Sequence, residues 1–136
     1  TLFGDRWQEA GDVYVKKYKD NNLPNLTALP QAKEMLDYIL ELDIFRAVVS
    51  NKQGPTLRSE CDYINWNKYF SAVIGASDAE RDKPFADPAI LALKGSNISP
   101  SKSVWFIGDS TPDVGCAVAA GLTPIIYGNE KLANYY

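Results

Sequence analysis

The stretch VWFIGDSTPD, residues 104–113, decides the fold of this chain. Its apolar run at 104–107 predicts a buried strand, which the following glycine ends. Ser110 or the next threonine can cap a helix, and Pro112 suits the first turn of that helix. Asp109 therefore lies where a strand stops and a helix begins, which is the edge of an open α/β sheet at which ligands bind.

Two carboxylates, Asp109 and Asp113, fall together at this strand end. Neighbouring negative charges repel unless a positive group lies between them. Mg²⁺ (magnesium) prefers oxygen ligands and keeps several waters, so the pair predicts a magnesium site. Asp113 taken alone also matches a capping-box acid, and this simpler role stays open. Asp109 precedes the cap, where capping requires no charge.

Length and composition restrict the class of protein. The chain has 136 residues, enough for one domain, and a formal net charge of -3. Its Lys and Arg residues are scattered, so we expect no nucleic-acid partner, and no apolar run approaches the roughly 20 residues of a membrane span. The chain contains no histidine, which excludes a Ser-His-Asp triad, a Cys-His pair and histidine metal sites. Cys61 and Cys116 fall in apolar helical patterns and are interpreted as buried thiols of a reducing, cytoplasmic compartment.

Apolar strand patterns alternate with helical patterns along most of the chain. This order predicts a parallel sheet in a doubly wound α/β fold. Strands are expected at 45–49, 72–74, 104–107 and 123–127, and helices at 30–42, 55–64, 88–94 and 114–120.

The first residues form a separate pattern. Apolar and aromatic side chains recur at helical spacing over 2–19, which predicts an amphipathic helix whose stripe serves packing. The stripe consists of Phe3, Trp7, Ala10, Val13, Tyr14 and Tyr18. Asp20-Asn21-Asn22 is expected to end this helix, and the two prolines at 24 and 30 indicate a linker. The chain is therefore divided into a helical part at 1–22, a linker at 23–29 and an α/β core at 30–136.

Polar residues also follow two of the other predicted strands. Ser50 and Asn51 follow the first strand, where a hydroxyl and backbone N–H groups beside a helix start can bind an anion. Lys83, held out of the helical region by Pro84, follows the second strand and can point across the strand ends toward a phosphate. An ordinary turn and a solvated loop lysine are the simpler alternatives. Hydroxyl, cation and carboxylates together are the groups that hold a phosphoryl group.

The ordered set is more specific than any one of its members. VVSNK at 48–52, Lys83-Pro84 and GDSTPD at 108–113 resemble motifs two, three and four of the haloacid dehalogenase superfamily, in its phosphatase branch. The resemblance spans about 29–127. The helix at 2–19 resembles the end of the helical cap of phosphoglycolate-phosphatase-like members. The resemblance implies a Rossmann-like core, a Mg²⁺ cofactor and a small phosphorylated metabolite as substrate.

The resemblance also implies a role for each motif residue. Ser50 would bind the phosphate through its hydroxyl and Asn51 through its backbone N–H. Lys83 would stabilise the phosphate and the nucleophile. Asp109 would bind Mg²⁺, and Asp113 would support the metal directly or through water. In this family an aspartate forms an aspartyl-phosphate that water hydrolyses, and a second aspartate two residues later acts as general acid and base.

One expected motif is absent from the sequence. No Asp-x-Asp occurs in the chain, so the nucleophile, the general acid and their strand are missing. In this family that strand lies in the centre of the sheet, between the strands that end at Ser50 and Asp109. We therefore expect the C-terminal part of a phosphatase, inactive alone, whose motif-one segment lies upstream of Thr1 or in a separate piece. The alternative is a non-catalytic phosphate- or partner-binding domain. A flavodoxin-like or receiver domain ranks lower, because a receiver's acidic pair would follow its first strand.

Overall fold

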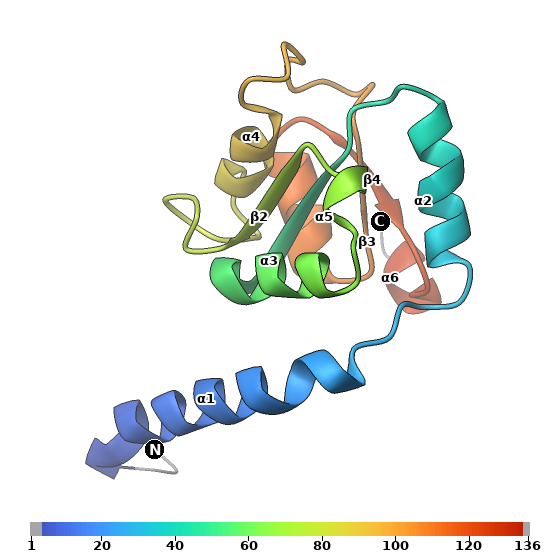
Figure 1. The fold of residues 1–136 in the computed structure, drawn as a ribbon. Helices are drawn as coiled ribbons and strands as arrows, with labels where there is room; N and C mark the ends of the chain where they lie inside the picture. The colour runs from blue at the N-terminus through green and yellow to red at the C-terminus, as the bar shows by residue number, and fades with distance from the viewer. Residues whose placement is uncertain (1–3, 135–136) are drawn as a thin grey trace.

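The computed structural model describes residues 4–134, which form two β-α-β units with additional helices around them (Figure 1). Each unit has two parallel strands joined by a crossover helix. Phe3 and the rest of 1–3 lie outside the described residues. The helices are α1 (Trp7–Asn25), α2 (Ala32–Glu41), α3 (Gly54–Tyr63), α4 (Asp87–Leu93), α5 (Thr111–Ala119) and α6 (Glu130–Ala133). The strands are β1 (Ala47–Gln53), β2 (Ala72–Ala76), β3 (Trp105–Gly108) and β4 (Thr123–Ile126), and 3₁₀ turns lie at Gly4–Arg6 and Asn67–Tyr69.

The predicted α/β fold with parallel strands is confirmed, but its sheet is divided in two. Strand β1 pairs with β2, and β3 pairs with β4. Within residues 4–134 no strand lies between β1 and β3, so no backbone ladder joins the two pairs. This division falls where the haloacid dehalogenase resemblance leaves its central strand absent.

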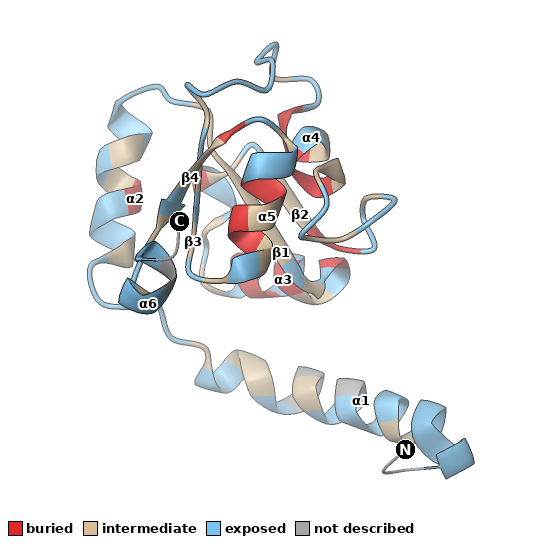
Figure 2. Cartoon of the chain, turned by 180° about the vertical axis from the view of Figure 1, so that it is seen from behind, coloured by how far each residue is buried: buried red, intermediate tan, exposed pale blue. Residues whose placement is uncertain are grey.

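The core lies between helices α4 and α5 and the second strand pair. Its buried residues are Ala89, Leu93, Cys116, Ala117 and Leu122, and Figure 2 shows buried residues on α4 and α5 as well as on α3. Small side chains on α5 allow the helix to approach the sheet closely. Both cysteines are buried and free, as the sequence predicted, and burial raises the pKa of each thiol.

Helix α1 differs from its prediction in length and in packing. It continues past the predicted end to Asn25, because Asn21 and Asn25 donate side-chain hydrogen bonds to backbone carbonyls four residues earlier, both at 2.8 Å. Its predicted packing stripe is largely open: Trp7 is 61% exposed and Tyr14 68% exposed. The element of the body that α1 contacts most is α3, and these two aromatic side chains of the stripe stay largely exposed.

Other elements also differ from their predictions. Strand β1 continues through the predicted turn to Gln53, with an irregular register after Val49. Helix α4 begins at Asp87, one residue before its predicted start, and the Asp87 carboxylate accepts hydrogen bonds from Arg81. Helix α6 was not predicted. Within the described range, none of the helices is both long and apolar enough to cross a membrane.

Candidate active site

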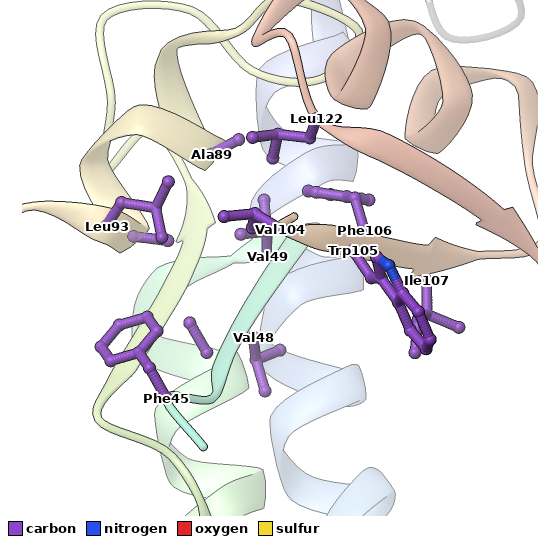
Figure 3. A pocket seen from close by; sticks show the side chains of 12 residues that line it. Phe45, Val48, Val49, Ala89, Leu93, Val104, Trp105, Phe106, Ile107 and Leu122 are labelled. Atoms are coloured by element: carbon purple, nitrogen blue, oxygen red, sulfur yellow. The ribbon is translucent and has the colours of Figure 1, made fainter. Parts of the chain in front are cut away.

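A largely apolar cavity of about 280 Å³ separates the two strand pairs (Figure 3). We call it the inter-strand slot. One wall is β1 and the other is β3, with α4 residues between them. Its lining comprises Phe45, Ala47, Val48, Val49, Ala89, Ala92, Leu93, Val104, Trp105, Phe106, Ile107 and Leu122. Trp105 remains 68% exposed and Ile107 56% exposed. Large apolar side chains at an open sheet edge mark a surface that lacks its cover.

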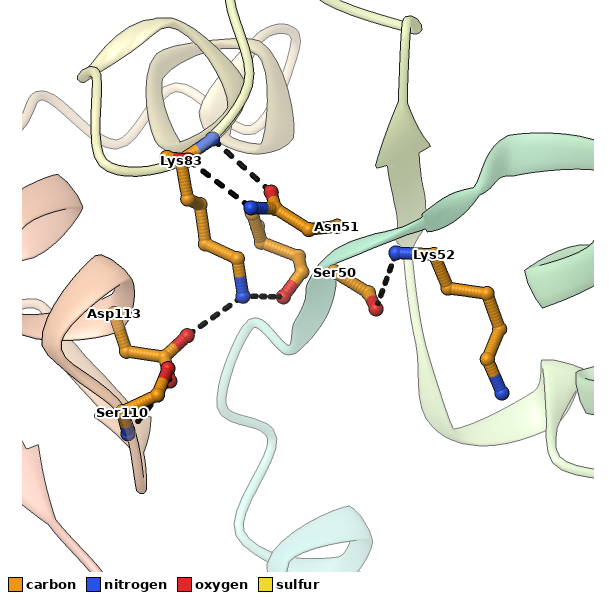
Figure 4. A network of polar contacts seen from close by, with 7 residues as sticks. Ser50, Asn51, Lys52, Lys83, Ser110 and Asp113 are labelled. Carbon is orange, nitrogen blue, oxygen red and sulfur yellow. Dashed lines mark hydrogen bonds and ion pairs between the residues drawn. The ribbon is translucent and has the colours of Figure 1, made fainter. Parts of the chain in front are cut away.

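Lys83 lies beside the inter-strand slot and connects β1 to α5 (Figure 4). Its ammonium nitrogen donates to the Val49 carbonyl of β1 at 3.0 Å. It also donates to Asp113 Oδ1 of α5 at 2.6 Å. An ammonium carries three protons, so one remains for a ligand. The sequence prediction that Lys83 points across the strand ends is confirmed.

Asn51 and Ser50 make hydrogen bonds to backbone groups near the end of β1. The Asn51 amide brackets the Lys83 backbone: Nδ2 donates to the Lys83 carbonyl at 3.0 Å, and Oδ1 accepts from its N–H at 3.1 Å. Ser50 Oγ accepts from the Lys52 N–H at 3.1 Å. Because this hydroxyl accepts from the backbone, its own proton is available for an anion.

Both carboxylate oxygens of Asp113 are engaged within the protein. Oδ1 accepts from Lys83, and Oδ2 accepts from the Ser110 N–H at 3.0 Å and from the Ser110 hydroxyl. The contact with Ser110 is that of a capping-box acid, the simpler role that the sequence left open. Burial opposes ionisation, but the hydrogen bonds from Lys83 and Ser110 outweigh it and hold the pKa of Asp113 below its ordinary value.

Asp109 provides the open carboxylate of the site. It is exposed at the end of β3, and its backbone carbonyl accepts from Asn129 at 2.8 Å. None of the described side chains makes a recorded hydrogen bond to its carboxylate. No group of three or more acidic, His or Cys side chains within 4–134 can hold a metal alone. One free carboxylate, with Asp113 nearby, fits a Mg²⁺ ion that completes its shell with water and substrate oxygens.

Gly108 permits the close approach of the β3 end to Asp113, a role that was not predicted from the sequence. A Cβ on Gly108 would lie 2.4 Å from the Cβ of Asp113, which is closer than real Cβ contacts. Gly115 has a similar place against the Lys83 loop, since its Cβ would lie 2.7 Å from that of Pro84. A glycine directly before the acidic residue was the available signal for a close backbone approach.

Gly108→Ala is expected to displace Asp113 and to destabilise the chain by about 1–3 kcal/mol, the usual range for overpacking. Urea unfolding of the purified variant measures this change. Gly11→Ala is the matched control, because a Cβ there meets nothing within 4 Å and alanine favours the helix. Equal unfolding midpoints for Gly108→Ala and the unchanged chain would contradict the close approach.

Known proteins resemble this chain over most of its length. Residues 3–126 match the family described as haloacid dehalogenase-like hydrolase. The phosphoglycolate phosphatase of Escherichia coli K12 is 38% identical over 74 residues, which cover 54% of this chain and 29% of that protein. The phosphoglycolate phosphatase of Chromobacterium violaceum is 24% identical over 125 residues, covering 92% of this chain and 56% of that protein. The chain thus spans little more than half the length of these curated relatives, or less.

Solved structures give the same result. A hydrolase of this superfamily from Ehrlichia chaffeensis has 38% sequence identity and a TM-score of 0.75, and the match covers 98% of this chain and 70% of that one. A subfamily IA hydrolase from Geobacter sulfurreducens has 25% identity and a TM-score of 0.82, covering 93% and 65%.

Proposed function

Because this chain belongs to the haloacid dehalogenase-like hydrolases, we propose that it is the part of a Mg²⁺-dependent phosphatase that holds a small phosphomonoester. The observation that carries this proposal is the position of Lys83, which spans the strand ends beside Ser50 and retains a proton for a ligand. Its relatives include phosphoglycolate phosphatases, so an ester of similar size and charge is the proposed substrate.

In this proposal, different residues bind the phosphate, orient the lysine and hold the metal. The Ser50 hydroxyl donates to one phosphate oxygen, and the backbone N–H of Asn51 donates to another. The Asn51 side chain holds the Lys83 loop in place, so the ammonium group meets the phosphate in a fixed position. Asp113 orients Lys83 through their ion pair, and Asp109 offers its carboxylate to Mg²⁺. When bound, the metal neutralises charge on the transferring phosphoryl group.

The nucleophile enters this proposal on a strand that fills the inter-strand slot. The β1 and β3 walls each present an unpaired backbone edge, and apolar side chains line the space between them. An extended segment ending in Asp-x-Asp would pair with both edges and bring its first carboxylate to the remaining proton of Lys83. That carboxylate attacks phosphorus and releases the alcohol, which the second aspartate protonates. Water then cleaves the aspartyl-phosphate to release phosphate.

One observation favours a second candidate, a non-catalytic phosphate- or partner-binding domain. The Lys83–Asp113 pair and the Asn51 bracket are complete without any nucleophile, so the loop geometry does not depend on catalysis. This candidate retains the anion site. It predicts that a longer form of the protein would also lack an Asp-x-Asp upstream of these residues.

Asp109→Asn tests the proposal in a form of the protein that carries the nucleophile strand. Metal ions contribute several kcal/mol to such reactions, so Mg²⁺-dependent phosphate release is expected to fall at least about a hundredfold. Thermal melting is expected to stay unchanged, since the Asp109 carboxylate is exposed. Asp62→Asn, an exposed change on α3, is the control. Full activity in Asp109→Asn would show that residues 108–113 only begin a capped helix and do not bind the metal.

A further inference from the structure

A buried carboxylate lies outside the proposed phosphate site. Glu60 of α3 is 6% exposed and accepts hydrogen bonds from three side chains. Lys52 Nζ donates to Oε2 at 2.5 Å, the Tyr18 hydroxyl donates to Oε1 at 3.2 Å, and Asn22 Nδ2 also donates to Oε1. A buried charge requires such partners, so the arrangement of all three donors depends on Glu60.

Two of the three donors come from helix α1, which has little else to hold it. The helix lies outside the compact body, next to α3 (Figure 1). Its residues Trp7, Val13 and Tyr14 are exposed, so apolar packing does not fix its direction. The polar contacts of Tyr18 and Asn22 with Glu60 therefore attach α1 to the body by hydrogen bonds.

The third donor leads to the proposed phosphate site. The Lys52 ammonium binds Glu60, while the Lys52 backbone N–H binds the Ser50 hydroxyl. Burial lowers the pKa of Lys52, but the hydrogen bonds with Glu60 and Tyr18 outweigh burial and raise it, so the ammonium stays charged. One residue thus joins the buried carboxylate to the hydroxyl that faces a ligand.

We infer that Glu60 is a positioning residue that fixes helix α1 and the Ser50–Lys52 segment of β1 relative to each other. In an enzyme, this contact would set where α1 stands over the strand ends when Ser50 holds a phosphate. The role given to Ser50 rests on the proposed phosphatase function, whereas the position of α1 does not.

Spin-label distances test the α1 half of this inference. Labels on cysteines introduced at exposed Lys16 of α1 and Lys94 after α4 report the position of the helix, and the buried native cysteines stay unlabelled. The unchanged chain is expected to give one narrow distance peak. Glu60→Gln is expected to lose that peak, because its single acceptor oxygen cannot accept from all three donors and its NH₂ group then faces a donor. Asp78→Asn is the matched control, since it breaks the other ion pair of α3 without contacting α1.

Amide signals in nitrogen–proton NMR spectra test the Ser50 half. Glu60→Gln is expected to shift the Ser50 and Lys52 signals, and Asp78→Asn to leave them in place. The double variant Tyr18→Phe with Asn22→Ala is expected to lose the narrow distance peak, while the NMR signals of the core stay unchanged. This variant tests the position of α1 even if Glu60→Gln unfolds the chain. A retained peak in this double variant, or unshifted Ser50 and Lys52 signals in folded Glu60→Gln, overturns the inference. Neither readout depends on catalysis. A protein without phosphatase activity would therefore contradict the proposed function and leave this inference standing.

Discussion

The 136-residue chain by itself is expected to release no phosphate above background from any phosphomonoester, with or without Mg²⁺. It contains no Asp-x-Asp, and its Asp113 carboxylate is already bound to Lys83 and Ser110. Joining it to a strand that ends in Asp-x-Asp and fills the inter-strand slot is expected to establish Mg²⁺-dependent release. A phosphate-release assay over a panel of small esters, phosphoglycolate included, measures both results.

Two controls separate catalysis from mere strand binding. The same strand with Asn-x-Asn is expected to fill the slot and raise the melting temperature without any turnover. Val49→Asp places a charge on the β1 wall and is expected to weaken both effects, since burying an unpaired carboxylate is unfavourable. Turnover by the chain alone would place the nucleophile among residues 1–136. Strand binding without turnover in the Asp-x-Asp form would support the non-catalytic alternative.

Lys83→Met is expected to destabilise the chain by about 3–5 kcal/mol at neutral pH, the range for removing one partner of a buried ion pair. Both side chains are 10% exposed, so the variant leaves the Asp113 carboxylate charged and shielded from water. Urea unfolding measures the loss. Lys33→Met is the control: it removes a lysine from the exposed Lys33–Asp37 pair and is expected to change the midpoint little.

The pH dependence of this loss identifies its cause. Lys83 helps to hold the pKa of Asp113 below its ordinary value, so the pair stabilises the fold fully above that value, near 4. This contribution is lost as pH falls through the depressed pKa of the folded protein. The difference between Lys83→Met and the unchanged chain should therefore shrink in acid. Adding Asp113→Asn to Lys83→Met should recover part of the loss, and a double variant less stable than the single one would contradict the pairing.

The sequence predicted the parts of this molecule whose signals are local. Apolar runs located the four strands of the described residues. Lys83 and Asp109 follow strands, whereas Ser50 lies within β1, which runs to Gln53. Their convergence followed from the rule that the ends of parallel strands meet at one edge. The contact between Lys83 and Asp113 needed the structure, because 30 residues separate them and no local pattern links them.

Tertiary contacts explain what the sequence left out. Helix α1 was predicted over 2–19 with its end at 20–22, but it continues to Asn25, and Asn22 donates a hydrogen bond to Glu60, 38 residues away. The aromatic stripe of α1 was interpreted as packing because helical spacing identifies a face without identifying its partner. Asn51 was assigned only a backbone role, since nothing in the sequence indicates that its amide brackets the Lys83 loop.

The divided sheet has a consequence for how the chain unfolds. Hydrogen bonds hold each strand pair together internally, whereas helix packing and the Lys83 contacts connect one pair to the other. The β3–β4 pair can therefore open without breaking any rung of the β1–β2 ladder, so two subglobal units with separate amide-exchange rates replace one cooperative transition. A strand hydrogen-bonded to both β1 and β3 would join the two units into one sheet. The domain would then unfold cooperatively only once the inter-strand slot is filled.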